Sequence, residues 1–200
     1  MRIFFLGDHE SKMDFFGGRS DLIHTSPENI NPGSDDILFD MRDEAWDVEL
    51  YSKFSNTVFL NAVIGTLAEH RAPEHIVRIN GWPGMLTRPR VEGSAIKSVQ
   101  EKANSILKKL DKDVDWVADV PGMVSPRVIA MIINEACFAE KEGVSNRSSI
   151  DTAMRLGTNY PNGPFEWADI IGLEKIFRLL EKLSLTDSRY EPADLLKQLP

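Results

Sequence analysis

The residues of this chain that could perform acid–base or metal chemistry are few and widely separated. His9 and His24 have no obvious carboxylate or nucleophile partner, and His70 and His75 fit exposed positions or strand ends. The four histidines show no spacing typical of metal ligands. Cys137 is the only cysteine, which excludes an internal disulfide and a cysteine-based metal site. We expect no metal, and we expect Cys137 to be buried on the apolar face of a helix as a small hydrophobic residue.

One basic segment could bind an anion. The sequence RPRVEGS, residues 88–94, brings together Arg88, Arg90 and Glu92, and Lys97 follows shortly after. Guanidinium and ammonium groups at this spacing could hold a phosphate. A solvated basic edge, in which Glu92 forms an ion pair with Arg88 or Arg90, would explain the same pattern.

The overall composition is that of a globular protein: 42% of the 200 residues are hydrophobic and 27% are charged. The formal net charge of −8 argues against a general attraction to nucleic acid or to an anionic membrane. No stretch reaches the roughly 18 apolar residues that a membrane-spanning helix needs. The first residues lack the pattern of a signal peptide. We therefore expect a soluble, cytoplasmic protein that binds neither nucleic acid nor membrane.

The elements that would position these residues fall into two parts. Up to about residue 118, short apolar runs alternate with helical stretches, a pattern typical of an open α/β sheet covered on both faces. The predicted strands are IFFLG (3–7), LIHT (22–25), DILFDM (36–41), TVFLNAVI (57–64), HIVRIN (75–80) and DVDWVAD (113–119). The predicted helices between them are EAWDVELYSKF (44–54) and AIKSVQEKANSILKKL (95–110).

The remaining residues, 119–200, are predicted to be helical throughout. Ser148 or Ser149 could cap the second of these helices, and Gly157 could end it. Pro164 suits the first turn of a third short helix that Gly172 would close. The other predicted helices are SPRVIAMIINEACFAEKEG (125–143), LEKIFRLLEKL (173–183) and EPADLLKQL (191–199). The glycines and prolines between the short helices favour a sharp packing angle rather than a catalytic loop.

This second part resembles a known family. DVPGMVSPR (119–127), NEA (134–136), EGV (142–144), IDTAMRLG (150–157) and YPNGPFEWADIIGL (160–173) follow the order of the C-terminal helical domain of 3-hydroxyacyl-CoA dehydrogenases. The residues that fit the family pattern are Asp119, Pro121, Gly122, Arg127, Glu135, Ala136, Gly143, Asp151, Gly157, Pro161, Gly163, Pro164, Asp169 and Gly172. RINGWPG (78–84) and RVEGS (90–94) are more faintly similar to earlier motifs of the same family.

The resemblance implies a shortened Rossmann-like parallel sheet in residues 1–118, followed by an all-helical domain in residues 119–200 that makes a homodimer. The family reaction is reversible hydride transfer between NAD and the 3-hydroxyl carbon of an acyl-CoA, a step of fatty acid metabolism. The resemblance also makes an acyl-CoA, or another small molecule, a candidate ligand. The 3′-phosphate of CoA is then a candidate for the basic segment at residues 88–97.

The chain departs from the family where the cofactor should bind. A dinucleotide-binding turn needs three glycines that let the backbone approach a pyrophosphate. Here Gly7 stands alone, and Gly17 and Gly18 come too late in the sequence. Asp8 and Glu10 add negative charge where the pyrophosphate would lie. The first part is also shorter than its counterpart in the family, so we expect no bound cofactor.

The catalytic positions implied by the resemblance also differ. Pro83 occupies the position of the family histidine that acts as the base, and Pro126 occupies that of a family asparagine. The segment NAVIGT, residues 61–66, has no serine where the family has one that faces the substrate. Glu92 is the only one of these family positions that is retained.

Three hypotheses remain open. The first is a degenerate family member without dehydrogenase activity that acts as a dimeric binding or interaction protein. The second is an active NAD-dependent dehydrogenase with a rearranged site, which an anion-binding helix N-terminus after Gly7 would support. The third is an acyl-CoA sensor that performs no hydride transfer.

Overall fold

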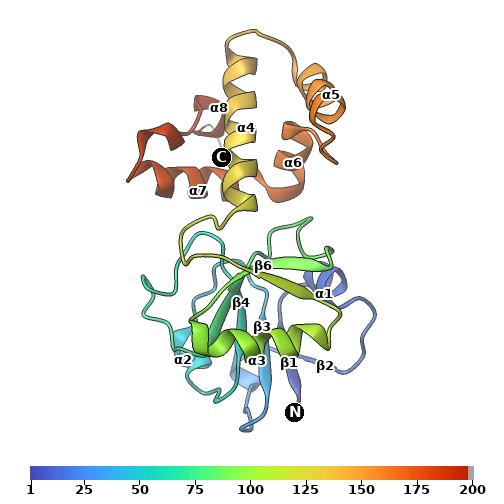
Figure 1. Cartoon of the computed structure of the whole chain (residues 1–200), viewed down its shortest axis with the longest axis vertical. Coiled ribbons are helices and arrows are strands. Elements are labelled where there is room, and N and C mark those ends of the chain that lie inside the picture. The colour runs from blue at the N-terminus through green and yellow to red at the C-terminus, as the bar shows by residue number, and fades with distance from the viewer. Residues whose placement is uncertain (198–200) are drawn as a thin grey trace. The chain divides into compact units, whose positions relative to one another are not determined.

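The computed structural model describes residues 1–197 and divides into two compact units, Met1–Met123 and Val124–Pro200. The first unit is α/β and the second is helical (Figure 1). The sequence pattern places the change from α/β to helical structure at residues 118 and 119, five residues before the division between the units.

The α/β unit contains seven strands and four helical segments. The strands are β1 (Ile3–Leu6), β2 (Leu22–His24), β3 (Ile37–Asp40), β4 (Val58–Asn61), β5 (Ile76–Ile79), β6 (Arg90–Ser94) and β7 (Asp113–Trp116). The helices are α1 (His9–Phe16), α2 (Val48–Tyr51) and α3 (Lys97–Lys108), with a 3₁₀ turn η1 (Pro27–Asn29). All six predicted strands are present, whereas α1 and β6 were not predicted.

The seven strands form one sheet in the order β2-β1-β3-β4-β5-β6-β7. Neighbouring strands are parallel except β5 and β6, where Arg78 lies opposite Ser94 in an antiparallel pair. The α/β fold class is therefore confirmed. The predicted Rossmann-like parallel sheet is present, with one antiparallel pair where a short connection turns the chain back beside β5.

Apolar side chains fill both faces of the sheet. One face buries a cluster of phenylalanines that includes Phe5, Phe15, Phe16 and Phe39, together with Ile106 and Leu107 of α3. The rings of Phe39 and Phe59 stack with centroids 4.4 Å apart. The opposite face buries Leu38, Leu60 and Tyr51 among others. Burial on both faces explains why the strands are continuous apolar runs.

The predicted helix at residues 44–54 is much shorter than expected. Only α2, Val48–Tyr51, is helical, and Asp47 caps it by accepting a hydrogen bond from Leu50 N at 3.0 Å. The residues before it form a loop because Glu44 binds Val63 N and the Trp46 ring stacks on His70, both in a different segment. Tertiary contacts therefore override the helical pattern there.

The helical unit contains five helices and a 3₁₀ turn within the described residues. They are α4 (Ser125–Lys141), α5 (Arg147–Thr158), α6 (Pro164–Ile171), α7 (Leu173–Ser184), η2 (Ser188–Tyr190) and α8 (Asp194–Lys197). Figure 1 shows α5 and α6 on one side of the long α4, with α7 and α8 on the other. The predicted last helix begins at Asp194 rather than near Pro192, and its residues 198 and 199 lie outside the described part.

The ends of α6 are as predicted, whereas those of α5 are not. Pro164 starts α6, and Gly172 ends it with φ +94°. For α5, Asn146 rather than Ser148 or Ser149 provides the cap, accepting a hydrogen bond from Ser149 N at 3.0 Å. The helix continues through Gly157 and ends where Asn159 adopts the left-handed conformation, φ +57°. Asparagine tolerates that conformation better than most residues.

The Gly- and Pro-rich stretch after α5 serves helix packing. Asp151, which is buried, accepts a hydrogen bond from Phe165 N at 2.8 Å, in the first turn of α6. A Cβ atom on Gly163 would lie 2.5 Å from Asp151 Cα. The two helices can approach this closely only because residue 163 is glycine. The prediction of an architectural stretch therefore agrees with these contacts.

Candidate functional site

The sheet of the α/β unit has a reversal of strand order beside β1. The chain passes from β1 to β2 on one side and then crosses to β3 on the other. Ligands of open α/β sheets bind outside the carboxyl ends of the strands at such a switch point. The candidate site is therefore formed by the segments that follow β1, β3 and β4.

The turn after β1 is tight and acidic. Gly7 has φ +149°, and a Cβ atom there would lie 2.9 Å from Phe5 Cζ and 3.0 Å from Met41 Cβ. Asp8 caps α1 by accepting a hydrogen bond from Ser11 N at 2.7 Å, and Glu10 lies in the first helical turn. A helix N-terminus after Gly7 thus exists, but a carboxylate of the chain itself occupies it.

The sheet is also narrower on this side than the common dinucleotide-binding sheet. In the common dinucleotide-binding sheet the strand order is 3-2-1-4-5-6, so two strands lie beyond strand 1 on one side. Here β2 alone lies beyond β1, and a connection that contains only the turn η1 leads back across to β3.

A buried carboxylate, Asp40, ends β3. Its oxygens accept hydrogen bonds from Arg42 Nε at 2.9 Å and Nη2 at 2.6 Å, and the Tyr51 hydroxyl lies 3.0 Å away. Asp40 raises the pKa of Arg42, and burial together with the charge of Asp40 raises the pKa of Tyr51. Both oxygens of the Asp40 carboxylate are thus bound by side chains of the chain itself.

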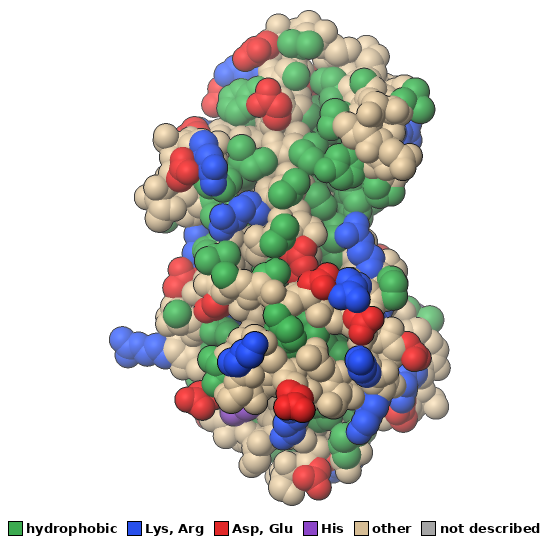
Figure 2. Space-filling view, in the orientation of Figure 1, with side chains coloured by type: hydrophobic (Ala, Val, Ile, Leu, Met, Phe, Trp, Pro, Cys, Tyr) green, Lys and Arg blue, Asp and Glu red, His purple; other side chains and the backbone are tan. Residues whose placement is uncertain are grey.

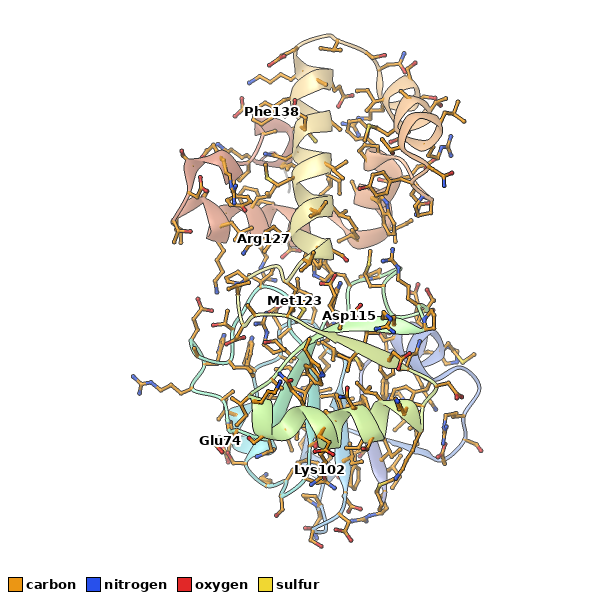
Figure 3. The ribbon with its side chains drawn as sticks, in the orientation of Figure 1. Glu74, Lys102, Asp115, Met123, Arg127 and Phe138 are labelled. Carbon is orange, nitrogen blue, oxygen red and sulfur yellow. The ribbon has the colours of Figure 1, made fainter. Side chains whose placement is uncertain are left out.

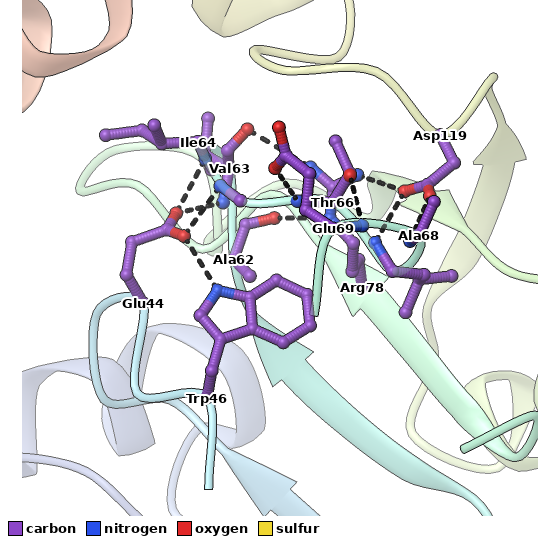
Figure 4. A network of polar contacts seen from close by, with 12 residues as sticks. Glu44, Trp46, Ala62, Val63, Ile64, Thr66, Ala68, Glu69, Arg78 and Asp119 are labelled. Atoms are coloured by element: carbon purple, nitrogen blue, oxygen red, sulfur yellow. Dashed lines mark hydrogen bonds and ion pairs between the residues drawn. The ribbon is translucent and has the colours of Figure 1, made fainter. Parts of the chain in front are cut away.

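A second carboxylate binds the loop that follows β4. Glu44 Oε1 accepts hydrogen bonds from Val63 N at 2.5 Å and Ile64 N at 2.6 Å, and Oε2 accepts one from Gly65 N at 2.8 Å (Figure 4). Trp46 Nε1 donates a fourth hydrogen bond to Oε2 at 3.2 Å. Successive backbone N–H groups of this kind form an anion-binding nest. Here the anion is the side chain of Glu44.

The next three amides of the same loop also donate to carboxylates. Thr66 N donates to Glu69 at 3.0 Å, and Leu67 N and Ala68 N each donate to Asp119 at 3.1 Å (Figure 4). Asp119 in turn forms an ion pair with Arg78, whose side chain is fully buried. The pKa of Arg78 is lowered by burial, and Asp119 opposes that shift. Six successive amides are thus bound by carboxylates of the chain.

The segment that corresponds to the family histidine is packed tightly against β4. Asn61 Oδ1 accepts a hydrogen bond from Gly81 N at 3.1 Å, and a Cβ atom on Gly81 would lie 2.3 Å from Asn61 Cγ. Trp82 is fully buried, and Pro83 follows it half-buried. Proline has no side-chain group that accepts or donates a proton.

Glu92, the family position that is retained, lies beside the segment that contains Pro83, because its backbone oxygen accepts a hydrogen bond from Asn80 N at 3.0 Å. Glu92 lies half-buried in β6, where it is in register with Asp115 of β7. Arg90 pairs with Asp115 at 2.7 Å and with Asp113 at 3.5 Å, so the acidic partners of this arginine lie on β7. Pro126 belongs to the first turn of α4 in the helical unit, a position that suits proline.

The histidines make structural contacts. His24 Nε2 lies 3.0 Å from Gly7 O, and His75 Nε2 lies 3.0 Å from Tyr51 O. The ring of His70 stacks on Trp46 with centroids 3.9 Å apart. His9 is exposed in α1. His24, His70 and His75 thus each contact another residue of the α/β unit.

Within residues 1–197, no group of three or more His, Cys, Asp or Glu side chains is arranged to hold a metal ion. No helix in this range is both long and apolar enough to cross a membrane. Cys137 is 2% exposed, and burial raises the pKa of its thiol to about 11. The prediction that it is a buried hydrophobic residue is confirmed.

The helical unit has a second candidate site, an apolar groove of about 550 Å³. Its walls include Val128, Met131, Ile132 and Ala136 of α4, and Ile150 and Met154 of α5. Arg127, Arg189 and Tyr190 lie at one end, and Glu135 also borders it. Figure 2 shows hydrophobic side chains gathered over the helical unit on the side of α4 and α5. The groove was not predicted, because it depends on how the helices pack.

The sequence also does not indicate that Glu44 and Asp119 bind the loop that follows β4. Glu44 and the amides it binds are 19 to 21 residues apart in the sequence. No local pattern marks such a contact. The family motif that contains Asp119 does not indicate that this carboxylate binds Arg78.

These features define a protein that joins an open α/β sheet to a helical unit. The family model of the 3-hydroxyacyl-CoA dehydrogenase C-terminal domain matches residues 122–200. The 3-hydroxyadipyl-CoA dehydrogenase of Escherichia coli (strain K12) is 48% identical over 103 residues, which are 50% of this chain and 22% of that protein. A probable 3-hydroxybutyryl-CoA dehydrogenase of Bacillus subtilis (strain 168) is 42% identical over 96 residues, 47% of this chain and 33% of that protein. Residues 122–200 of the chain are thus similar to the C-terminal domain of the 3-hydroxyacyl-CoA dehydrogenase family.

Solved structures agree with the fold. The (S)-3-hydroxybutyryl-CoA dehydrogenase of Ralstonia eutropha is similar with a TM-score of 0.73 at 23% identity, covering 90% of this chain and 69% of that chain. The 3-hydroxybutyryl-CoA dehydrogenase of Escherichia coli K12 has a TM-score of 0.59 at 37% identity, covering 70% of this chain and 30% of that chain. The chain thus aligns with a fifth to a third of the length of the curated relatives named above.

Proposed function

We propose that this chain is a 3-hydroxyacyl-CoA dehydrogenase-like protein without dehydrogenase activity, which acts in the cytoplasm as a dimeric interaction protein. The observation that carries the proposal is the carboxylate of Asp8 at the N-terminus of α1. Its hydrogen bond with Ser11 N, at 2.7 Å, uses an N–H group that a pyrophosphate would need.

The residues at the switch point do not suit NAD. The spacing of a dinucleotide-binding turn requires glycines two and five residues after Gly7, where this chain has His9 and Lys12. Asp8 and Glu10 would repel a pyrophosphate at the helix end, where the dipole otherwise favours an anion. We therefore assign no step to a nicotinamide cofactor.

The groups needed for proton transfer are also missing. Oxidation of a hydroxyl requires a base within hydrogen-bond reach of its proton. Pro83 cannot serve, and the carboxylates nearest the strand ends are bound by Arg42, Arg78 and backbone amides. Glu92, in β6, is the one family position of this kind that the chain retains.

The interaction role rests on the helical unit. Its groove is open, apolar and about 550 Å³ in volume, and Val128 beside it is 47% exposed. An exposed apolar patch of this kind is typical of a surface that another protein covers. A second copy of the chain is the partner we propose, with no role for nucleic acid or membrane.

The proposal is tested by calorimetric titration with NADH, alone and with acetoacetyl-CoA present. We expect no heat from NADH, whereas the probable 3-hydroxybutyryl-CoA dehydrogenase of Bacillus subtilis serves as a positive control. NADH binding would overturn the proposal in favour of an active enzyme with a rearranged site. Binding of acetoacetyl-CoA without NADH would overturn it in favour of an acyl-CoA sensor.

The dimer is tested separately by sedimentation. The chain has a mass of 22.5 kDa, so we expect a species of twice that mass at micromolar concentration. A monomer across this range would remove the proposed partner. Asp8→Ser, which keeps a capping oxygen but removes the charge, should leave the dimer unchanged and shows whether charge alone prevents NADH binding.

A further inference from the structure

We propose that Asn162 is a site of spontaneous deamidation, at which the backbone nitrogen of Gly163 attacks the side-chain amide. The chain has a second asparagine followed by glycine, Asn80–Gly81, which the fold protects. The reaction consumes only water and needs neither a cofactor nor a partner, so it is independent of the proposed function.

The reaction depends on the glycine that follows the asparagine, because a residue without a Cβ atom lets its backbone nitrogen approach the preceding side chain. The Gly163 nitrogen loses its proton and forms a bond with Asn162 Cγ, while the bond from Cγ to the side-chain nitrogen breaks. That nitrogen takes up the proton and leaves as ammonia, so a cyclic imide remains. Water then opens the imide at either carbonyl carbon and yields aspartate or isoaspartate. No atom is oxidised or reduced.

Asn162 lies in the bend between α5 and α6, where it is half-buried. It borders a small hollow together with Ile129 and Ile132 of α4. That part of α4 lies between Arg127 and Phe138, which Figure 3 labels near its two ends. Segments that connect helices are more mobile than the helices themselves, so the Asn162 amide can rotate towards the next backbone nitrogen.

The backbone nitrogen of Gly163 is held by a contact near the surface. It donates a hydrogen bond to Glu166 Oε2 at 2.8 Å, as in a capping box at the start of α6. Arg155 donates to the other oxygen of Glu166 at 2.7 Å, and the side chains of this ion pair are 43% and 37% exposed. Gly163 itself is buried, so attack requires the first turn of α6 to open. Helix ends open at a low cost in free energy, and release of Glu166 frees the nitrogen.

The other Asn-Gly pair follows β5 and is held more firmly. Asn80 is 3% exposed, and its Oδ1 accepts a hydrogen bond from Trp82 N at 3.3 Å. Gly81 N donates to Asn61 Oδ1 at 3.1 Å, and Trp82 is fully buried. Movement of Gly81 N towards the Asn80 side chain therefore requires this end of the sheet to unfold, which costs much more than the opening of a helix end.

Deamidation at Asn162 alters the junction between α5 and α6. Isoaspartate continues the chain through its side-chain carbon, which adds a methylene group to the backbone before Gly163. The added group displaces Gly163 from Asp151, the contact that lets the two helices approach closely. Both products also place a new carboxylate at the hollow, which shares Ile132 and Met154 with the apolar groove.

Mass spectrometry of the aged protein tests the assignment. The purified chain is incubated in mildly alkaline buffer, either folded or in urea, and the tryptic peptides of residues 79–90 and 156–175 are sequenced. In the folded chain, deamidation with isoaspartate should be at least about tenfold faster at Asn162 than at Asn80. In urea the two sites should react at similar rates. Equal rates in the folded chain, or an unreactive Asn162 there, would overturn the proposal.

Two substitutions of Glu166 test how the site is restrained. Glu166→Ala removes the acceptor of Gly163 N and should accelerate deamidation at Asn162 about tenfold, with no change at Asn80. Glu166→Gln keeps an acceptor oxygen, so its rate should lie nearer to that of the wild type. An unchanged rate at Asn162 in Glu166→Ala, or an equal acceleration at Asn80, would overturn the role of Glu166.

Thermal unfolding tests the effect on packing. The Tm of the wild type should fall as the folded protein ages, because isoaspartate accumulates beside Gly163. Asn162→Ala cannot deamidate at this position, so its Tm should stay constant over the same time. An equal fall in both proteins would overturn the predicted effect on the junction of α5 and α6.

Discussion

The two units bind their loops and helix ends by different means. In the α/β unit, Asp40, Glu44 and Asp119 are carboxylates that bind cations and backbone amides at the carboxyl ends of the strands. In the helical unit, Asn134 binds Glu191 O at 2.9 Å and Ala193 N at 2.8 Å, and Gly163 lets two helices touch. The first unit thus buries members of its ion pairs, such as Asp40 and Arg78, whereas ion pairs of the second, such as Lys141 with Asp194, are exposed.

This difference bears on function. Each of these three carboxylates has two or more partners within the chain. The helical unit keeps the residues of the family pattern, because Asp151, Gly163 and Gly172 are needed for its packing. The packing of the helical unit therefore accounts for these three family residues without a catalytic role for them.

The largest effect is expected at the buried ion pair. Asp119→Ala leaves the fully buried Arg78 without its carboxylate and removes the acceptor of two amides. We expect a loss of about 3–5 kcal/mol in the free energy of unfolding, measured by urea denaturation. Asp115→Ala, which breaks an exposed pair with Arg90, is the control and should have little effect. A loss below about 1 kcal/mol for Asp119→Ala would contradict the importance of charge in this unit.

The next effect tests close packing in the helical unit. Gly163→Ala would place a Cβ atom 2.5 Å from Asp151 Cα, so the helices must separate, at a cost of about 2–3 kcal/mol. Gly157→Ala is a matched control in α5, where a Cβ atom meets nothing within 4 Å. It should stabilise the unit by about 0.5–1 kcal/mol, because alanine favours the helix. Equal effects of the two substitutions, measured by thermal unfolding, would argue against the contact.

A smaller effect is expected from the carboxylate in the amide nest. Glu44→Gln keeps one acceptor oxygen but turns an amide nitrogen towards N–H donors, so we expect a loss of about 2 kcal/mol. Glu49→Gln, on the exposed side of α2, should change the free energy of unfolding very little. Hydrogen exchange should rise at residues 63–65 in the first variant only. Unchanged protection there would mean that the loop does not depend on Glu44.

The strands of the sheet and the helices of the second unit could be predicted from periodicity and from Gly and Pro. Helix α1 was missed because its buried residues, Phe15 and Phe16, lie together at its end and give no repeating pattern. Strand β6 was missed because charged and apolar residues alternate over only five positions that include Gly93. Such short elements are set by the neighbours they pair with.

For the candidate site, the sequence shows only which family residues are replaced. The lack of glycines after Gly7 and the prolines at residues 83 and 126 can be found in the sequence by comparison with a motif. The contacts of Glu44 with Val63–Gly65 join two loops, and they follow from the position of β3 beside β4. In the sequence alone, a glutamate that makes such a contact cannot be distinguished from one that is exposed on the surface.

The smallest expected effect is a change in the free energy of unfolding at acidic pH. The guanidinium of Arg2 and the amides of Arg2 and Gly33 hold the pKa of Asp36 well below its ordinary value of 3.8. A depressed pKa contributes stability that is fully present above the unfolded pKa and is lost as the pH falls below it. The difference in unfolding free energy between wild type and Asp36→Asn should therefore shrink from pH 6 towards pH 2.

The control for this titration lies in the helical unit. Lys141 lowers the pKa of Asp194 in the same direction, but the Asp194 side chain is 56% exposed, against 6% for Asp36. Salt screens an exposed pair more than a buried one. Asp194→Asn should therefore differ from wild type only at low ionic strength, whereas the Asp36→Asn difference should persist in 0.5 M salt. If the stability differences of both variants from wild type vanish in 0.5 M salt, the burial of Asp36 does not protect its ion pair from screening.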